Sequence, residues 1–205
     1  KLPNPPSLGE FAGSPPQLTP LEAGTLLWRV YFRRGPHPTR WNGFRTYGPS
    51  SSRFDHHVTP ARRQARAILY GARNGPTCLA EVFQKTRTID RCTDDPWLVG
   101  FRLTREVVLL DLTGAWPTRA GASMAINNGP HARARLWSQA IYDSYPTVEG
   151  LWYCSSMDAN RPAVALYERA ISAMPANPEF HRALGNLALT SMIKRSASRF
   201  GYAVI

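Results

Sequence analysis

The sequence of residues 98–112, LVGFRLTREVVLLDL, contains two apolar runs on either side of a polar triplet. The runs cover residues 98–103 and 107–112, and Thr104, Arg105 and Glu106 separate them. Short runs rich in valine and leucine that end at polar residues are typical of buried strands. This stretch therefore predicts two strands joined by a short turn, and a fold built on a sheet.

Strands and helices are predicted on both sides of this pair. In the helix that follows residue 76, Glu81 points more than a right angle away from the apolar face, at about 100° per residue. Pro130 and the triplet Asn177-Pro178-Glu179 are favourable helix starts, and Gly201 is a favourable helix end. The predicted strands cover residues 25–32, 67–72, 150–155, 163–167 and 202–205, and the predicted helices residues 77–85, 130–144 and 177–201. The sequence thus predicts one α+β domain over residues 23–205, with mixed short strands and about three helices.

Two segments have the composition of irregular structure. Residues 1–22 contain six prolines among small and polar residues, a composition that favours an extended segment over helix or strand. We therefore expect a Pro-rich N-terminal arm that stays outside the core. Residues 35–60 are rich in Gly, Pro, Ser and Arg, and a loop of that length inside a domain is usually functional or mobile.

Length and composition exclude several classes of protein. Of the 205 residues, 43% are hydrophobic and 19% charged, which argues against a disordered or fibrous protein. No apolar run approaches the roughly 18 residues that a membrane-spanning helix needs. Cys78, Cys92 and Cys154 are an odd number without C-x-x-C spacing. They favour the reduced thiols of a cytoplasmic protein over a disulfide framework or a zinc site.

Positive charge is concentrated in one part of the chain. The formal net charge is +11, and residues 28–74 contain ten arginines against a single acid, Asp55. Guanidinium groups suit bidentate contacts with phosphate or carboxylate, so this segment favours an anionic partner. A general preference for arginine over lysine would produce the same composition without any ligand.

Several familiar site motifs are missing from the sequence. The glycine-rich motifs of dinucleotide-binding and P-loop proteins do not occur, nor do H-E-x-x-H and G-x-S-x-G. His56 and His57 are adjacent, so they cannot share a helix face as metal ligands at i and i+4 do. No metal site is predicted.

Four features remain as candidates for a site. They are Arg29 within an apolar strand, Arg53-Phe54-Asp55 at the end of the loop, Tyr70 with Glu81 eleven residues later, and Ser155 at the end of a strand. Each has a simpler explanation, since strands that are buried on one face alternate and serines and tyrosines commonly end strands. None of the four decides the function alone.

In their order along the chain, these features resemble the RES domain, named for its Arg, Glu and Ser. The resemblance spans residues 26–168, most of the predicted domain. The matching segments are residues 27–31 (LWRVY), 47–49 (YGP), 52–55 (SRFD), 69–70 (LY), 78–82 (CLAEV), 109–114 (LLDLTG) and 149–155 (EGLWYCS). Each segment is short, but their order and spacing together make the match specific.

The resemblance implies a bacterial toxin of a toxin–antitoxin pair, with a fold similar to that of ADP-ribosyltransferases. Such toxins cleave the nicotinamide–ribose bond of NAD by hydrolysis or phosphorolysis, with inorganic phosphate as a possible co-substrate and no metal. Some relatives instead ADP-ribosylate a protein. The implied partner is an Xre-like antitoxin with a helix-turn-helix domain that covers the active cleft, so contact with DNA is only indirect.

The implied catalytic residues are Glu81, Arg29 and Ser155, and the implied substrate-binding residues are Arg53, Tyr70 and Tyr31. A carboxylate such as Glu81 stabilises the positive charge that develops on the ribose as the bond breaks. Arg29 and Arg53 suit the pyrophosphate. The Tyr70 ring suits the cationic nicotinamide, and Ser155 offers a hydroxyl near it.

Two departures and two rival interpretations stay open at this stage. The interval between Arg53 and Tyr70 is longer than the pattern suggests, and it contains the basic run at 62–66; the Pro-rich start also lies outside the pattern. Aromatic residues between the arginines would also suit a nucleic-acid-binding module. A catalytically idle member of the same fold, kept for its interactions, is the other rival.

Overall fold

A nine-stranded mixed sheet organises the chain, for which the computed structural model describes residues 2–7, 10–11 and 13–205. The strand order is β1-β7-β8-β9-β4-β2-β6-β10, with β3 paired to β4; only β7 and β8 pair in parallel within it. The strands are β1 (Leu18–Leu21), β2 (Leu26–Phe32), β3 (Arg45–Gly48), β4 (Arg62–Ala72), β6 (Pro96–Arg102), β7 (Val107–Asp111), β8 (Gly150–Cys154), β9 (Pro162–Tyr167) and β10 (Phe180–Ala183). The predicted α+β class with a mixed sheet is confirmed.

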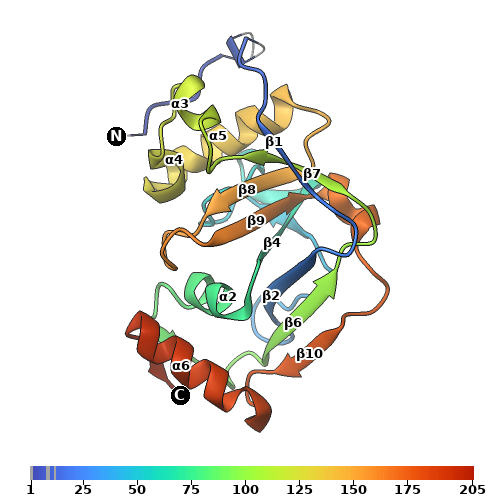
Figure 1. Ribbon diagram of the computed structural model, residues 1–205, viewed down its shortest axis with the longest axis vertical. Helices are drawn as coiled ribbons and strands as arrows, with labels where there is room; N and C mark the ends of the chain where they lie inside the picture. Colours follow the sequence, from blue (N-terminus) through green and yellow to red (C-terminus); the bar gives the residue numbers. More distant parts are fainter. Residues whose placement is uncertain (1, 8–9, 12) are drawn as a thin grey trace.

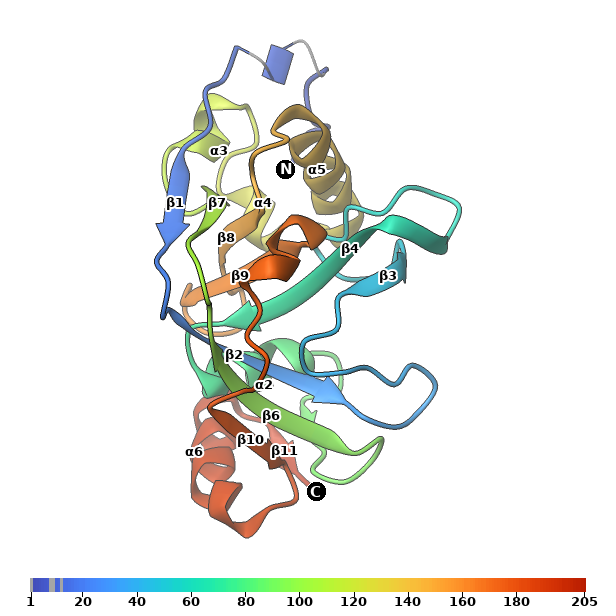
Figure 2. The ribbon, with the colours of Figure 1, turned by 90° about the vertical axis from the view of Figure 1, so that its right-hand side faces the viewer.

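The helices lie in two groups (Figure 1). In that view α3, α4 and α5 lie above β7 and β8, whereas α2 and α6 lie in the lower half, at the level of β2, β6 and β10. Figure 2 shows the long β4 running between the two halves. The helices are α2 (Gly75–Val82), α3 (Trp116–Arg119), α4 (Ala125–Asn128), α5 (His131–Ser144) and α6 (Thr190–Phe200). Two short strands, β5 (Thr88–Ile89) and β11 (Ala203–Val204), form a separate parallel pair.

Both faces of the sheet are buried, which explains the continuous apolar runs in the sequence. Successive strand residues point to opposite faces. Thus Leu109 packs in one hydrophobic cluster and Leu110 in the other, and Val164 and Ala165 are divided in the same way. The larger cluster also contains the buried faces of α2, α5 and α6.

Helix α2 begins at Gly75 because Asn74 caps its first turn and Pro76 lies within that turn. The side chain of Asn74 accepts a hydrogen bond from the Thr77 N–H at 2.8 Å, and Pro76 occupies the first turn. Both features satisfy or remove N–H groups that a helix start leaves without partners. The helix starts two residues earlier than predicted and ends at Val82, so Glu81 lies in its last turn.

The structure corrects the expectation that residues 1–22 form an arm outside the core. Leu2 and Phe11 are fully buried, and the Phe11 ring packs within 6.0 Å of the rings of Trp116 and Trp137. Strand β1 pairs antiparallel with β7 at the edge of the sheet, where Pro20 is tolerated. The prolines predicted an extended backbone, but they did not show that its few large apolar side chains enter the core.

The predicted helix over residues 177–201 is also wrong in its first half. Residues 180–183 form the edge strand β10, which pairs with β6, and α6 begins only at Thr190. The Phe180 ring packs 5.3 Å from that of Trp28, so burial against the sheet outweighs the helix start signal at Asn177. Gly201 ends α6 with a φ of 65°, as predicted.

Candidate active site

Two adjoining cavities open between the sheet and α2, and Glu81 lines both of them. Their volumes are about 300 and 320 Å³. Tyr70, Val82 and Tyr153 are also shared between them. Residues that line only the first cavity include Arg29, Tyr31, His37, Thr39, Arg45 and Cys78, and those that line only the second include Ser51, Ser52, Arg53, Lys85 and His131.

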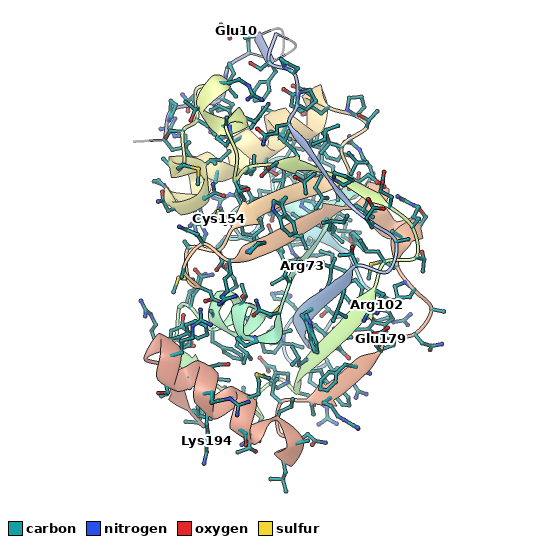
Figure 3. All side chains as sticks on the ribbon, in the orientation of Figure 1. Glu10, Arg73, Arg102, Cys154, Glu179 and Lys194 are labelled. Atoms are coloured by element: carbon teal, nitrogen blue, oxygen red, sulfur yellow. The ribbon has the colours of Figure 1, made fainter. Side chains whose placement is uncertain are left out.

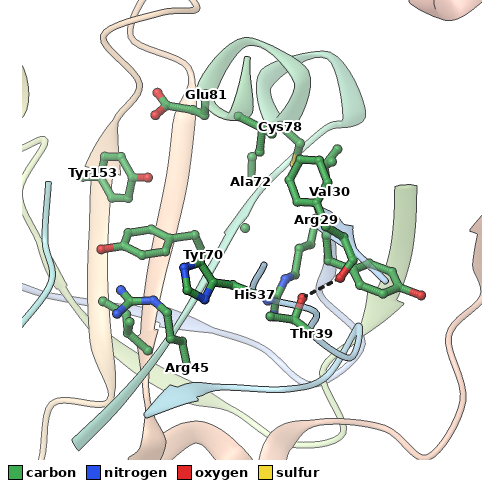
Figure 4. Close-up of a pocket in the computed structure, with 15 residues that line it drawn as sticks. Arg29, Val30, His37, Thr39, Arg45, Tyr70, Ala72, Cys78, Glu81 and Tyr153 are labelled. Atoms are coloured by element: carbon green, nitrogen blue, oxygen red, sulfur yellow. Dashed lines mark hydrogen bonds between the residues drawn. The ribbon is translucent and has the colours of Figure 1, made fainter. Parts of the chain in front are cut away.

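Glu81 faces the phenol rings of Tyr70 and Tyr153 across the space where the cavities meet (Figure 4). Its position follows from the chain path: β4 carries Tyr70, the turn at Arg73 and Asn74 reverses the chain, and α2 then returns Glu81 over the strand. Tyr153 comes from β8. Residues far apart in the sequence thereby enclose one carboxylate.

The Ser155 side chain holds the Glu81 carboxylate through a hydrogen bond. Its hydroxyl donates a hydrogen bond to Glu81 Oε1 and accepts bonds from the N–H groups of Met157 and Asp158, both at 3.2 Å. A serine hydroxyl has one proton and two lone pairs, so these three contacts use its full capacity. Ser155 is fully buried. The structure thus brings together two of the predicted site residues in a contact that the sequence did not predict, with Ser155 orienting the carboxylate.

Burial raises the pKa of Glu81 above its ordinary value, against the lowering effects of the Ser155 hydrogen bond and the Arg53 charge; Asp158 adds a further raising effect. A raised pKa means that the carboxylate is less well stabilised than it would be in water. A positive charge brought into the cavity therefore stabilises the ionised form of such a group. This is the property expected of a carboxylate that stabilises a cationic transition state.

Basic side chains also line the second cavity. Lys85 Nζ donates to Ser51 Oγ at 2.9 Å, and His131 Nδ1 lies 2.8 Å from the Ser51 carbonyl oxygen. Arg53 donates to the carbonyl of Gly129, and burial lowers its pKa. The cavity thus has two cationic side chains, Arg53 and Lys85, an arrangement that suits phosphate oxygens, together with the imidazole of His131, whose pKa is lowered by burial.

Arg29 borders the first cavity, where it also holds the loop after β2. Its Nη1 donates to the carbonyls of Gly43 at 3.0 Å and Trp41 at 3.3 Å. Burial lowers the pKa of Arg29 to about 10, so the group stays charged at neutral pH. The predicted surface alternative for Arg29 is wrong, because the side chain is buried and directed at a cavity wall.

The two tyrosines predicted from the resemblance differ in their surroundings. The Tyr70 hydroxyl is buried, and within the part of the chain that the structure describes it has no hydrogen-bond partner. Burial raises its pKa, so it stays neutral and able to donate. Tyr31 also lines the first cavity, but its hydroxyl is 2.6 Å from His181 Nε2, and the two rings stack. Tyr70 is therefore better placed than Tyr31 to contact a ligand.

Several residues around the cavities were not singled out in the sequence. Tyr153 had a usable signal, since it lies within the matching segment 149–155. Lys85 and His131 had none, because the segment after α2 and the start of α5 line the same cavity only in the folded chain. Arg45 and His37 lie in a segment whose composition predicted only a loop.

Two aromatic residues of the basic segment pack against other rings, whereas Tyr47 is 52% exposed. Phe54 is fully buried against Tyr153, and the Trp41 ring packs 5.8 Å from that of Phe101. Stacking of bases needs exposed aromatic faces. This arrangement weakens the interpretation as a single-strand-binding module.

Comparison with known proteins agrees with these features. The family model described as the RES domain matches residues 26–185. A chain from the crystal structure of the M. tuberculosis MbcT-MbcA toxin-antitoxin complex has a similar fold, with a TM-score of 0.56 and 15% sequence identity over 86% of this chain and 92% of that chain. No curated protein gives a match. Within the described ranges, no helix is both long and apolar enough to cross a membrane.

Proposed function

The chain belongs to the RES domain family, and from this membership we propose that it is the toxin of a toxin–antitoxin pair and cleaves the nicotinamide–ribose bond of NAD. The observation that carries the proposal is Glu81 at the junction of two cavities, with a raised pKa and a basic cavity on one side. The likeness in fold to a chain of the MbcT-MbcA complex supports the assignment to a toxin–antitoxin system.

The reaction needs one bond to break and one to form. The bond between ribose C1′ and the nicotinamide nitrogen breaks, and its electron pair leaves with the ring, which becomes neutral. An oxygen of water or phosphate then bonds to C1′; where water is the nucleophile, the proton that it loses passes to the solvent. Positive charge on the ribose is largest between these events, and the Glu81 carboxylate stabilises it there. Ser155 keeps that carboxylate oriented throughout.

We assign the two ends of the dinucleotide to the two cavities. The pyrophosphate suits the second cavity, where Arg53, Lys85 and His131 line the wall. The nicotinamide ring suits the first cavity, whose lining includes Tyr70 and several apolar side chains. In this placement Arg29 holds the wall of the nicotinamide cavity and is not the main phosphate ligand.

The test is release of nicotinamide from NAD by the purified protein, with and without phosphate, beside the Glu81→Gln variant. Glu179→Gln is the matched control, since Glu179 forms an exposed ion pair with Arg102 at 2.6 Å (Figure 3). Release by the wild type and the control, but not by Glu81→Gln, supports the proposal. Phosphate stimulation with ADP-ribose-1″-phosphate as product would identify phosphorolysis, and indifference to phosphate would identify water as the nucleophile.

Transfer of ADP-ribose to a protein is the second candidate, because the same site would serve it. Adding cell extract as a source of acceptors, with NAD labelled in the adenosine part, distinguishes the two. Label that appears on protein favours the transferase. If neither free product nor labelled protein forms, the enzymatic proposal is wrong.

We also propose that the partner is an antitoxin that covers the two cavities, in keeping with the name of the MbcT-MbcA complex. The cations around the cavities would favour acidic groups on the covering segment. The same proposal gives this partner an Xre-like helix-turn-helix domain. Full NAD turnover by a purified complex would contradict it.

A further inference from the structure

Asp158 is a buried acid near the candidate site, and its carboxylate contacts other side chains of the protein and lines neither cavity. It is 1% exposed and lies three residues after Ser155, in the turn that follows β8. The turn is tightly folded: Asn160 N–H donates to the Ser155 carbonyl at 3.1 Å, and Ala159 and Asn160 have φ values of 46° and 59°. The left-handed backbone at both positions shows that the turn returns sharply on itself.

Residues 155–158 hold α2 at two points. Ser155 contacts Glu81, and Asp158 Oδ2 accepts a hydrogen bond from Thr77 Oγ1 at 2.6 Å. Thr77 and Glu81 are four residues apart, so they lie on one face of the helix, one turn from each other. Two contacts spaced by one turn resist both rotation of α2 about its axis and sliding along it.

The charge of Asp158 is compensated by the C-terminal helix. Arg199 of α6 donates to Asp158 Oδ1, and the Arg161 side chain lies 3.7 Å from the same oxygen. A buried carboxylate is tolerated when cations and hydrogen bonds surround it. Through Asp158, α6 therefore takes part in supporting α2, although α6 contributes no residue to either cavity among those identified.

We propose that Asp158 is a positioning residue for the reaction: with Ser155 it clamps α2 so that the Glu81 carboxylate stays at the junction of the two cavities. The kinetic test of this inference rests on the proposed function, because it measures nicotinamide release. Its consequence is that removal of the Asp158 contact reduces turnover while leaving the substrate-binding cavities in place. Displacement of a catalytic group by a fraction of an ångström suffices for such a loss.

The test compares Asp158→Asn, Thr77→Val and the double variant in steady-state nicotinamide release. Each single variant should lower kcat about tenfold or more and change KM by less than about threefold. The combined loss in the double variant should be smaller than the two single losses together, because each single change already removes the Thr77–Asp158 contact. Asp158→Asn also removes the charge that faces Arg199, and Thr77→Val also removes the hydroxyl contact with Asn74. Glu179→Gln serves as the control for loss of one carboxylate. Additive losses, or losses only in KM, would overturn the clamp.

A second readout does not depend on turnover. Asp158 contributes to the raised pKa of Glu81, after burial as the main cause. Titration of the Glu81 carboxyl by 13C NMR should therefore show a lower pKa in Asp158→Asn and no comparable change in Thr77→Val, which keeps the charge. If the wild type releases no nicotinamide, the proposed function fails. The clamp is then judged by protection of the α2 amides against hydrogen exchange in Thr77→Val and Asp158→Asn, and unchanged protection in both variants would refute it.

Discussion

Asp55 and Glu81 are two enclosed carboxylates in the same half of the chain, but their oxygens have different partners. Asp55 is fully buried and accepts from Arg45 Nη2 at 2.8 Å, from the His57 N–H at 3.2 Å, and from the Ser50 N–H and the His57 ring. Among the described residues, the Glu81 carboxylate accepts one hydrogen bond, from Ser155 to Oε1. One carboxylate is saturated with donors and the other faces a cavity.

The two carboxyl groups shift their pKa in opposite directions for this reason. Burial alone would raise the pKa of Asp55, but the His57 hydrogen bond and the Arg45 charge outweigh burial and hold it far below its ordinary value. For Glu81, burial outweighs Ser155 and Arg53, and the pKa is raised. The comparison shows that burial does not itself make a functional carboxylate. The two carboxylates differ in how many protein donors of the described chain already surround them: Asp55 has several, whereas Glu81 has one and can still interact with a substrate.

The largest expected effect is on activity, from Glu81→Gln. The rate of nicotinamide release should fall about a hundredfold to a thousandfold, because the developing ribose cation loses its counter-charge. The melting temperature should stay the same or rise, since a carboxylate with a raised pKa costs stability at neutral pH. Kinetics and thermal unfolding of the same preparation measure both. A fall in melting temperature of many degrees would mean that Glu81 is a structural group like Asp55.

The reverse pattern is expected for Asp55→Asn. The free energy of unfolding should fall by about 3 kcal/mol, because Arg45 is left beside a neutral amide and one side-chain N–H faces existing donors. Urea denaturation at pH 7 measures this. Asp143→Asn is the control: it removes an acid from a partly exposed ion pair with Arg66 and should cost no more than about 1 kcal/mol. Equal losses in the two variants would contradict the structural role of Asp55.

Acid should remove activity before it removes the fold. Glu81 must be ionised, so kcat should decline as pH falls through its raised pKa, above the ordinary value of about 4.3. The stability that Asp55 contributes is present above its unfolded pKa and is lost only as pH falls through its depressed folded pKa. A pH profile of kcat and pH-dependent unfolding check the order. Loss of structure at a higher pH than loss of activity would break the comparison.

The smallest expected effect concerns the Tyr70 hydroxyl, which like Glu81 is left without sufficient partners. Tyr70→Phe should stabilise the protein by up to about 1 kcal/mol, because a buried hydroxyl without a partner is removed. Its effect on KM should not exceed about tenfold. Tyr202→Phe is the matched control, since the Tyr202 hydroxyl donates to the Ala80 carbonyl at 3.2 Å and its loss should destabilise. Destabilisation by Tyr70→Phe would show that this hydroxyl has a partner in solution.

Much of the fold could be predicted because the interior strands consist mainly of apolar residues and end at polar ones. Strands β6, β7, β8 and β9 lie within two residues of the predicted positions. The strands of this sheet that were missed are β1, β3 and β10, which each pair with one neighbour and whose short sequences have weak patterns of their own. Their conformation depends on β7, β4 and β6 beside them, which no local pattern of residues 18–21, 45–48 or 180–183 records.

Residue types in a fixed order were enough to predict the class of fold, the family and the main candidate residues, which are Glu81, Ser155, Tyr70, Arg29 and Arg53. The contacts of these residues became visible in the folded chain. Ser155 supports Glu81, Arg29 holds a loop, and Asp55 is saturated whereas Glu81 is not. The physical reason is that the pKa of a carboxylate depends on how many donors and charges surround it, and α2, β4 and β8 bring those groups together from distant parts of the chain.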